Sequence, residues 1–333
     1  MKLLDHYVPQ AHLKKWLLPG VEHLFAIRKS DLVTFKPSPK NICAVRDGNT
    51  NKFLQPARKI EEFLEKNEPR YSQAVDALSS GDEDRESILV LAGFVACIML
   101  TAPAGNRMHR PFLKKILEST ALSLSNNGSL PRLRGQSAAD LIRSDALSIN
   151  VNGLYPQAVA IEQLDKLVIG LTHGEWELIR NELPESPFFT SDYPVGIAVS
   201  KQFPRINDKL VPLTPELALR IKPNLDTERT DAAFTKFKFR SRRASFEEVT
   251  DINRAIVRCA ENTIVYKADL PWIERFVAQN KDYWVEEKVT VRRSKRSATH
   301  FSRQVIAKRP SDAASEQLPE GEHWFDISAK RVE

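Results

Sequence analysis

The chain is predicted to fold as an α+β protein in which a helical layer packs on a mixed or antiparallel sheet. Apolar residues recur with helical spacing through most of the first half, whereas short β-rich segments separated by proline and polar residues follow Gly174. The 333 residues, 42% of them hydrophobic, are ample for a packed core and correspond in length to two domains of roughly 150 residues each, or to a single large domain with a tail.

The N-terminal half is expected to begin with a short helix and a hairpin. Pro9 fits the first turn of a helix through Leu17, and HLFAIRK and LVTFKP then alternate as two strands around residues 29–31. The longest apolar run, Ile88–Leu100, is shorter than the about 20 residues that a bilayer needs, so it predicts a buried central helix. Helical spacing in this half predicts helices at 55–78, 86–101, 110–124, 137–146 and 156–170.

The C-terminal half is expected to carry most of the sheet. WELIR, PFFTS, VGIAV, LVPL and LALRI predict strands, and they are followed by a helix at 247–261, a strand at 263–266, a helix after Pro271 and a strand at 284–291. From Arg292 the chain is basic and then polar, which predicts a partly mobile extension. The expected parts are 1–172, a hairpin plus helical region; 173–291, a sheet-rich region packed with it as one composite domain; and 292–333, a basic C-terminal extension.

Composition narrows the function classes. A net charge of +6 and a pI near 9.1 permit a nucleic-acid partner without requiring one. Three scattered cysteines favour neither a disulfide framework nor a zinc site, and no apolar stretch of signal-peptide length begins the chain. We therefore expect a cytoplasmic protein without a membrane segment. The absence of GxSxG, Gly-rich phosphate loops and paired CxxC argues against triad hydrolases, nucleotide-binding loops and zinc enzymes.

The first candidate site segment is HYVPQ. Pro9 holds Val8 extended, so His6 lies on a rigid approach to the helix that carries Gln10 in its first turn. His6 could act as a general base, metal ligand or anion donor, with Gln10 orienting a substrate. The alternative is that His6 caps the helix or bonds a backbone carbonyl.

The second segment is FFTSDYPV, where Ser191 and Asp192 follow a buried strand and precede a proline-stiffened bend. Asp192 could hold a divalent metal such as Mg or Mn, or pair with His6, and is the strongest single candidate for catalysis. Alternatively, Ser191 and Asp192 bond their own backbone in a turn.

Glutamates supply a third element. Glu61, Glu65 and Glu68 are spaced to share one helix face, and Glu68 is expected to point inward and join His6 and Asp192 as a catalytic or metal-binding acid. A solvated acidic face, neutralised by Arg58 and Lys66, is the alternative.

Two basic segments are candidates for phosphate contacts. On a strand, Lys236, Lys238 and Arg240 would line one face, together with Arg242, while phenylalanines line the other. A second cluster follows at residues 292–296. A charged edge strand and a solubilising tail are the alternatives. The tripeptide Glu286–Lys288 matches the ExK arrangement of some metal nucleases, a pattern that also occurs often by chance.

Five segments carry a resemblance to a known family: HYVPQAHLKKWL, IEEFLEKNEP, FFTSDYPV, PLTPELAL and DINRAIVRCAENTIVYKAD. Over roughly residues 6–268 the chain resembles a bacterial domain-of-unknown-function family with HxVPxxxL and SDxPV motifs. The Borvo type of antiphage defence consists of a single protein of this kind, so the resemblance implies intracellular defence by abortive infection. The motif residues that carry over are His6, Pro9, Gln10, one of Glu61 and Glu62, Glu68, Ser191, Asp192, Pro194, Pro212, Thr214, Pro215 and Asn253.

This chain departs from the family pattern at two places. Thr101, Ala102 and Pro103 follow the central apolar helix where members often have a basic residue, and Arg107 is the first cation after it. SDYPV replaces the commoner SDNPV, which removes an amide.

Two hypotheses follow. In the first, the chain is an effector enzyme, a metal-dependent nuclease or other phosphodiesterase, with His6, Glu68 and Asp192 around the metal and Gln10, Ser191 and Asn253 on the substrate. In the second, the two motif segments only brace the junction of helices and sheet, and the basic strand at 236–242 contacts nucleic acid or a phage component. Substitution of Asp192 by alanine separates them.

Overall fold

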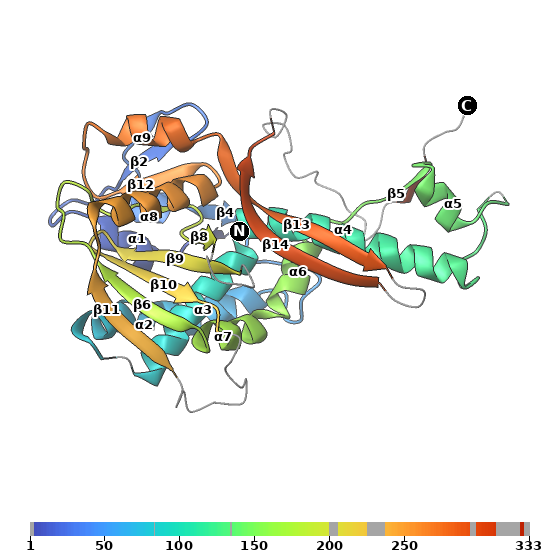
Figure 1. Cartoon of the computed structure of the whole chain (residues 1–333), viewed down its shortest axis with the longest axis horizontal. Helices are drawn as coiled ribbons and strands as arrows, with labels where there is room; N and C mark the ends of the chain where they lie inside the picture. The colour runs from blue at the N-terminus through green and yellow to red at the C-terminus, as the bar shows by residue number, and fades with distance from the viewer. Residues whose placement is uncertain are drawn as a thin grey trace.

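The structure, a computed structural model of the whole chain, describes residues 3–82, 84–133, 135–199, 206–224, 237–293, 298–310 and 327–329 (Figure 1). Its helices are α1 (Gln10–Leu13), η1 (Lys14–Trp16), η2 (Pro39–Asn41), α2 (Lys59–Ser80), α3 (Arg85–Thr101), α4 (Pro103–Asn126), α5 (Ala138–Arg143), α6 (Tyr155–Ile161), α7 (Leu164–Thr172), α8 (Phe246–Cys259) and α9 (Ile273–Asn280). Its strands are β1 (Leu4–His6), β2 (Phe25–Arg28), β3 (Thr34–Phe35), β4 (Ala44–Arg46), β5 (Leu147–Ile149), β6 (Glu175–Arg180), β7 (Thr190–Ser191), β8 (Gly196–Val199), β9 (Asn207–Thr214), β10 (Leu217–Lys222), β11 (Lys238–Arg243), β12 (Thr263–Tyr266), β13 (Tyr283–Arg293), β14 (Ala298–Lys308) and β15 (Ile327–Ala329).

The main sheet has five strands in the order β11-β6-β10-β9-β8. It is mixed, because β11 runs parallel to β6 while the other neighbours are antiparallel. A second sheet has the order β3-β2-β12-β7, and its β2–β3 pairing confirms the hairpin expected around residues 29–31.

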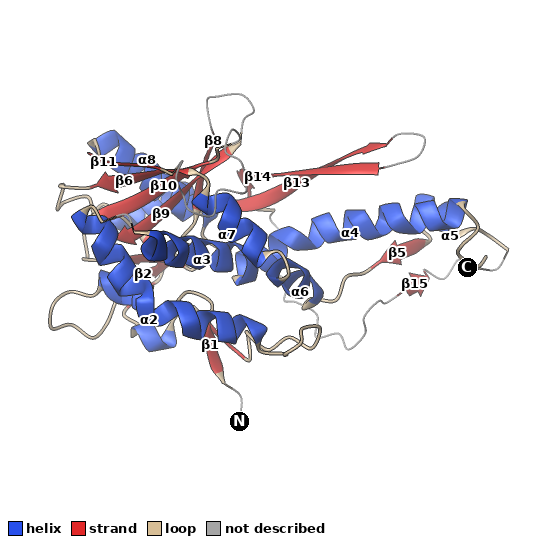
Figure 2. Ribbon diagram, turned by 90° about the horizontal axis from the view of Figure 1, so that it is seen from below, coloured by secondary structure: helices blue, strands red, loops and turns tan. Residues whose placement is uncertain are grey.

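The main sheet is covered on both faces, and side chains alternate between two cores as strand geometry requires. Trp176, Leu178 and Leu219 belong to the larger core, which they share with α2, α3 and α7. Ile179 and Leu210 turn the other way and join the core under α8. Figure 2 shows α2, α3 and α7 on one side of the sheet and α8 on the other. The predicted α+β class, with a helical layer on a mixed sheet, is confirmed.

The expected central helix is α3, which is buried almost throughout because it is apolar on every side. Two other helices differ from expectation. α4 starts at Pro103 rather than at 110, since proline is well suited to a first helical position. The single helix expected at 156–170 is two helices, α6 and α7, that break at Glu162–Gln163.

The largest departure is at residue 292, where the extension was expected to begin. β13 runs through this position to Arg293 and pairs along its whole length with β14. Because a lone two-stranded hairpin is marginally stable, it needs support, and α4 supplies it: His109 Nδ1 lies 3.6 Å from Glu287 Oε2, and His300 Nε2 hydrogen-bonds Ser119 Oγ at 3.1 Å. Figures 1 and 2 both show α4 and the hairpin side by side, extending together from the body of the molecule. We call α4 with β13 and β14 the arm.

Several predicted features lie outside the described residues, namely Lys236, the cluster at 294–296 and most of the chain after 310. In the part of the chain that is described, no single helix has both the length and the apolar composition to cross a bilayer, and only α3 with α4, bent by 61° at their junction, meet that test as a pair.

Candidate functional site

His6, Gln10 and Glu68 lie together where β1 and α1 meet α2. Gln10 N–H donates to Glu68 Oε1 at 3.0 Å, so the carboxylate satisfies a donor at the start of α1. His6 Nε2 donates to Lys40 O at 3.1 Å. Burial raises the pKa of Glu68 above its ordinary value, although the Gln10 N–H and the nearby His6 work against that rise. The structure therefore gathers these three predicted residues in one half-buried cluster.

The acidic face of α2 is divided rather than shared. Glu61 turns inward and accepts a hydrogen bond from Asn49 Nδ2 at 2.7 Å, whereas Glu65 is exposed. Arg58 lies 3.5 Å from Glu61 and forms a closer ion pair with Asp5 at 2.9 Å. Burial raises the pKa of Asp5, but the Arg58 guanidinium and the Asn49 N–H outweigh it and hold the pKa below its ordinary value. Glu61 and Asp5 are thus both paired with Arg58.

Asp192 is buried at the end of β7, and its carboxylate accepts hydrogen bonds from backbone N–H groups. Its Oδ1 accepts the Glu261 N–H at 2.9 Å, and its Oδ2 accepts the N–H groups of Asn262 and Thr263 at 2.7 and 2.8 Å. These donors belong to residues 260–263, which connect α8 to β12 and which we call the junction loop. Burial raises the pKa of Asp192 to about 6, while the N–H groups favour the charged form. The carboxylate fixes a loop.

Two other charged side chains bind the junction loop. Lys29, 1% exposed, donates from Nζ to Ala260 O at 2.7 Å and to Tyr283 O at 2.8 Å. Arg107 on α4 pairs with the Glu261 carboxylate at 2.9 Å. Arg107, the first cation after the central helix, thus lies one turn into α4 and contacts the junction loop.

The junction loop also connects the body to the arm. Arg107 Nη2 donates to Val285 O at 3.0 Å, and its guanidinium lies 3.8 Å from the ring centre of Trp284. Arg309, just after β14, donates to Glu261 O at 3.2 Å. Both ends of the hairpin are therefore tied to the loop that Asp192 holds.

Ser191 and Asn253 are braces as well. Ser191 Oγ accepts the Tyr193 N–H at 3.1 Å, the turn geometry that was the alternative for this residue. Asn253, 1% exposed, donates from Nδ2 to Pro187 O at 2.9 Å and accepts the Phe189 N–H at 2.9 Å. It joins α8 to the segment that leads into β7.

The two motif segments meet, but not through His6 and Asp192. The polar partners of His6 lie around Lys40 and Glu68, whereas those of Asp192 lie in the junction loop. Tyr7 is the member of HYVPQ whose hydroxyl is affected by the charge of Asp192. Burial raises the pKa of the Tyr7 hydroxyl far above its ordinary range, and the negative charge of Asp192 adds to this.

Magnesium or manganese does not fit the predicted ligand set. Within the described residues, no three or more His, Cys, Asp or Glu side chains are grouped so that they could hold a metal ion. Asp192 directs both oxygens at N–H donors, which occupy the positions a cation would need. His6, Glu68 and Asp192 are therefore not gathered around one metal position.

The predicted basic strand is β11, and its cations are paired. Glu177, whose side chain is 2% exposed, forms ion pairs with Arg240 at 2.5 Å and with Arg242 at 2.8 Å. Lys238 pairs with Glu175 at 2.6 Å. Burial raises the pKa of Glu177, but its hydrogen bond from Arg242 and the surrounding cations outweigh this and lower the pKa to about 2. The strand is an edge of the sheet whose positive charges are compensated.

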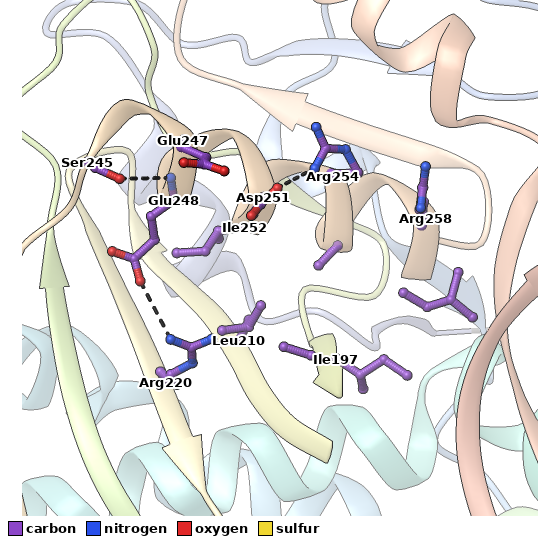
Figure 3. Close-up of a pocket in the computed structure, with 13 residues that line it drawn as sticks. Ile197, Leu210, Arg220, Ser245, Glu247, Glu248, Asp251, Ile252, Arg254 and Arg258 are labelled. Atoms are coloured by element: carbon purple, nitrogen blue, oxygen red, sulfur yellow. Dashed lines mark hydrogen bonds and ion pairs between the residues drawn. The ribbon is translucent and has the colours of Figure 1, made fainter. Parts of the chain in front are cut away.

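A cavity of about 510 Å³ lies between α8 and the sheet, with an apolar floor and a charged rim (Figure 3). Figure 3 shows the rim charges turned toward one another: Asp251 pairs with Arg254, and Glu248 lies 3.5 Å from Arg220. His6, Glu68 and Asp192 do not line it. The cavity is separate from the predicted site.

Two important polar residues escaped the sequence reasoning. His12 is fully buried between Tyr71 Oη and Thr190 Oγ1, each 2.7 Å from a ring nitrogen, and burial lowers its pKa to about 3. Its spacing with Leu13 and Trp16 on one helix face is the signal that places it inside. Lys29 was interpreted only as part of a hairpin turn, and its burial against a distant loop has no local signature.

The fold and the braced junction define an α+β protein with a projecting arm. Residues 5–269 match the family described as "Protein of unknown function (DUF4238)", and the chain belongs to this family. The match includes α4 and the junction loop and ends before β13. No curated protein matches the chain. No solved structure matches it either.

Proposed function

We propose that this chain is an antiphage defence protein that acts by binding nucleic acid through its arm, rather than as a metal-dependent nuclease. The defence role rests on the resemblance of HYVPQ, SDYPV and their companion motifs to Borvo-type proteins. The binding role is supported by one observation above all: the outer face of the hairpin carries three exposed cations around an exposed aromatic ring, and among the described residues only Lys288 has a carboxylate within 4.0 Å.

Cross-strand register sets the composition of this face. Lys288 lies opposite Arg303, Thr290 opposite Phe301, and Arg292 opposite Thr299. Alternate residues point to opposite sides of a strand, and Val285 and Glu287 point toward the body and α4. These three pairs are therefore on the outer face, and all six residues are exposed. We call them the outer patch.

The patch has little internal compensation. The Lys288 side chain is 65% exposed and lies 4.0 Å from Glu286, a separation at which a surface ion pair contributes little. Among the described residues, Arg303 has no carboxylate partner, and Arg292 lies over the Phe301 ring at 5.5 Å. By contrast, the β11 cations that were expected to bind phosphate are held by Glu175 and Glu177. Free cations favour phosphate binding because they lose no existing partner.

Binding by variants with matched charge loss tests the proposal. Fluorescence anisotropy of labelled RNA, single-stranded DNA and duplex DNA would compare the parent, the arm variant Lys288→Gln/Arg292→Gln/Arg303→Gln and the β11 control Lys238→Gln/Arg240→Gln/Arg243→Gln. We expect the arm variant to lose most of the affinity and the control to keep it. In phage-challenged cells, only the arm variant should lose protection.

The same probes, incubated with magnesium or manganese, address the enzyme hypothesis. We expect them to remain intact. Metal-dependent cleavage that disappears in a folded Glu68→Gln or Asp192→Asn variant would contradict the proposal and support the nuclease hypothesis. Loss of binding in the β11 control with full binding by the arm variant would contradict it as well.

A further inference from the structure

The arm face suits one kind of nucleic acid better than another. We propose that the outer patch binds single-stranded nucleic acid by stacking a base on Phe301 while Lys288, Arg292 and Arg303 hold the adjoining phosphates. This inference rests on the proposed function and specifies its ligand. Its starting observation is that Phe301 is 50% exposed at the centre of a basic strand face, where a polar residue would be the ordinary choice.

The Phe301 ring is half exposed and has a fixed position. Phe301 sits on β14, paired with Thr290 of β13, so its backbone is held by the hairpin ladder. Thr290 and Thr299 beside it are small, and therefore leave the ring accessible. Arg292 lies over the ring at 5.5 Å and adds a cation that can also reach a phosphate. A flat aromatic platform flanked by cations is the usual arrangement for bases of a single strand.

Spacing along the strands agrees with this ligand. The pairs Lys288–Arg303, Thr290–Phe301 and Arg292–Thr299 are successive positions on one face, about 7 Å apart at the usual rise per residue. Cations therefore lie on both sides of the ring along the strand direction. A chain of nucleotides running along the hairpin would place phosphates near Lys288 and Arg303 on one side and near Arg292 on the other, while one base covers Phe301.

A duplex fits the patch less well. Its bases are stacked on one another and offer only their edges, so Phe301 would face a sugar-phosphate backbone. The patch also belongs to a hairpin supported by α4 on its inner face. Double-stranded DNA would therefore engage the cations alone and gain nothing from the ring.

The test uses the full chain, with 2-aminopurine placed in single-stranded DNA, in RNA of the same sequence and in a matched duplex. Variants are Phe301→Ala, the conservative Phe301→Tyr, and Phe246→Ala as a control, because Phe246 is also exposed, at 62%, but lies on α8. We expect Phe301→Ala to weaken single-strand binding about tenfold or more and to abolish the quenching of 2-aminopurine on binding, since a stacked base contributes about 1 to 3 kcal/mol. Phe301→Tyr and Phe246→Ala should bind like the parent.

The results distinguish base stacking on Phe301 from the proposed function, which is nucleic-acid binding by the arm. Equal affinity for duplex and single strand, unchanged by Phe301→Ala, would overturn base stacking, while salt-sensitive binding lost in the arm variant would still support the proposed function. No binding of any probe by the folded parent would overturn both. Tighter binding of RNA than of the matching DNA would identify RNA as the ligand through its ribose hydroxyl, and equal binding would show that the patch reads base and phosphate alone.

Discussion

Asp192 illustrates how a residue that looks catalytic in sequence can be structural. Three backbone N–H groups converge on its carboxylate, from residues about seventy positions further along the chain. The sequence pointed to this residue because polar residues at the end of a buried strand commonly mount a functional site on a rigid element. The hydrogen-bond partners of Asp192 could not be predicted, because almost every residue has a backbone N–H group and the loop sequence does not indicate where those groups point.

Asp192→Ala is therefore expected to destabilise the fold. It leaves three donors in a buried site without an acceptor, and each unsatisfied buried group costs about 1 to 3 kcal/mol. We expect a loss of about 2 to 4 kcal/mol in the free energy of unfolding, measured in urea, with Asp192→Asn losing less because its amide oxygen still accepts. Asp251→Ala, on the exposed side of α8, serves as the control. Unchanged stability of Asp192→Ala would contradict the bracing role.

The N-terminal cluster was easier to anticipate. Proline next to a short helix limits where His6 and Gln10 can lie, and an acid followed by Pro69 on α2 was expected to point inward. The hydrogen bond from Gln10 to Glu68 agrees with that expectation. Local stiffness in the chain made this part of the site predictable, whereas the long-range contacts of Asp192 with residues 261–263 were not.

At the scale of elements, β11 was predicted from the sequence, whereas β14 was not. β14 was missed because its polar and charged residues alternate with few apolar ones, a pattern that resembles an extension when considered alone. Its partner β13 and the helix behind it provide the burial that the sequence of β14 lacks. The cations of β11 were correctly placed on one face of a strand, but the acid that neutralises them comes from the neighbouring strand.

The pairing of Glu177 under β11 predicts an acid-dependent stability. Its folded pKa of about 2 is below its ordinary value near 4.5, so its contribution is present above that value and is lost as pH falls through about 2. Glu177→Gln should lose about 1 to 3 kcal/mol in urea at neutral pH, because its partly exposed partners are screened by solvent, and should show a flatter loss on acidification. The exposed neighbour Glu175→Gln is the control. A parent-like acid profile for Glu177→Gln would contradict this.

At the scale of the whole molecule, a braced junction supports a projecting arm. Asp192 and Lys29 hold the junction loop from the body, while Arg107 and Arg309 connect it to α4 and the hairpin. The α+β class followed from hydrophobic period alone. The arm did not, because it depends on packing between α4 and strands that lie far along the chain.

The most direct test of the arm as the contact surface is the salt dependence of single-strand binding, measured by anisotropy across a series of salt concentrations. Each phosphate neutralised by the protein contributes about 0.7 to the slope of log affinity against log salt. Removing the three patch cations, Lys288, Arg292 and Arg303, should therefore reduce that slope by about 2, while the β11 control leaves it as in the parent. An unchanged slope in the arm variant, or an equal reduction in the β11 control, would contradict the account.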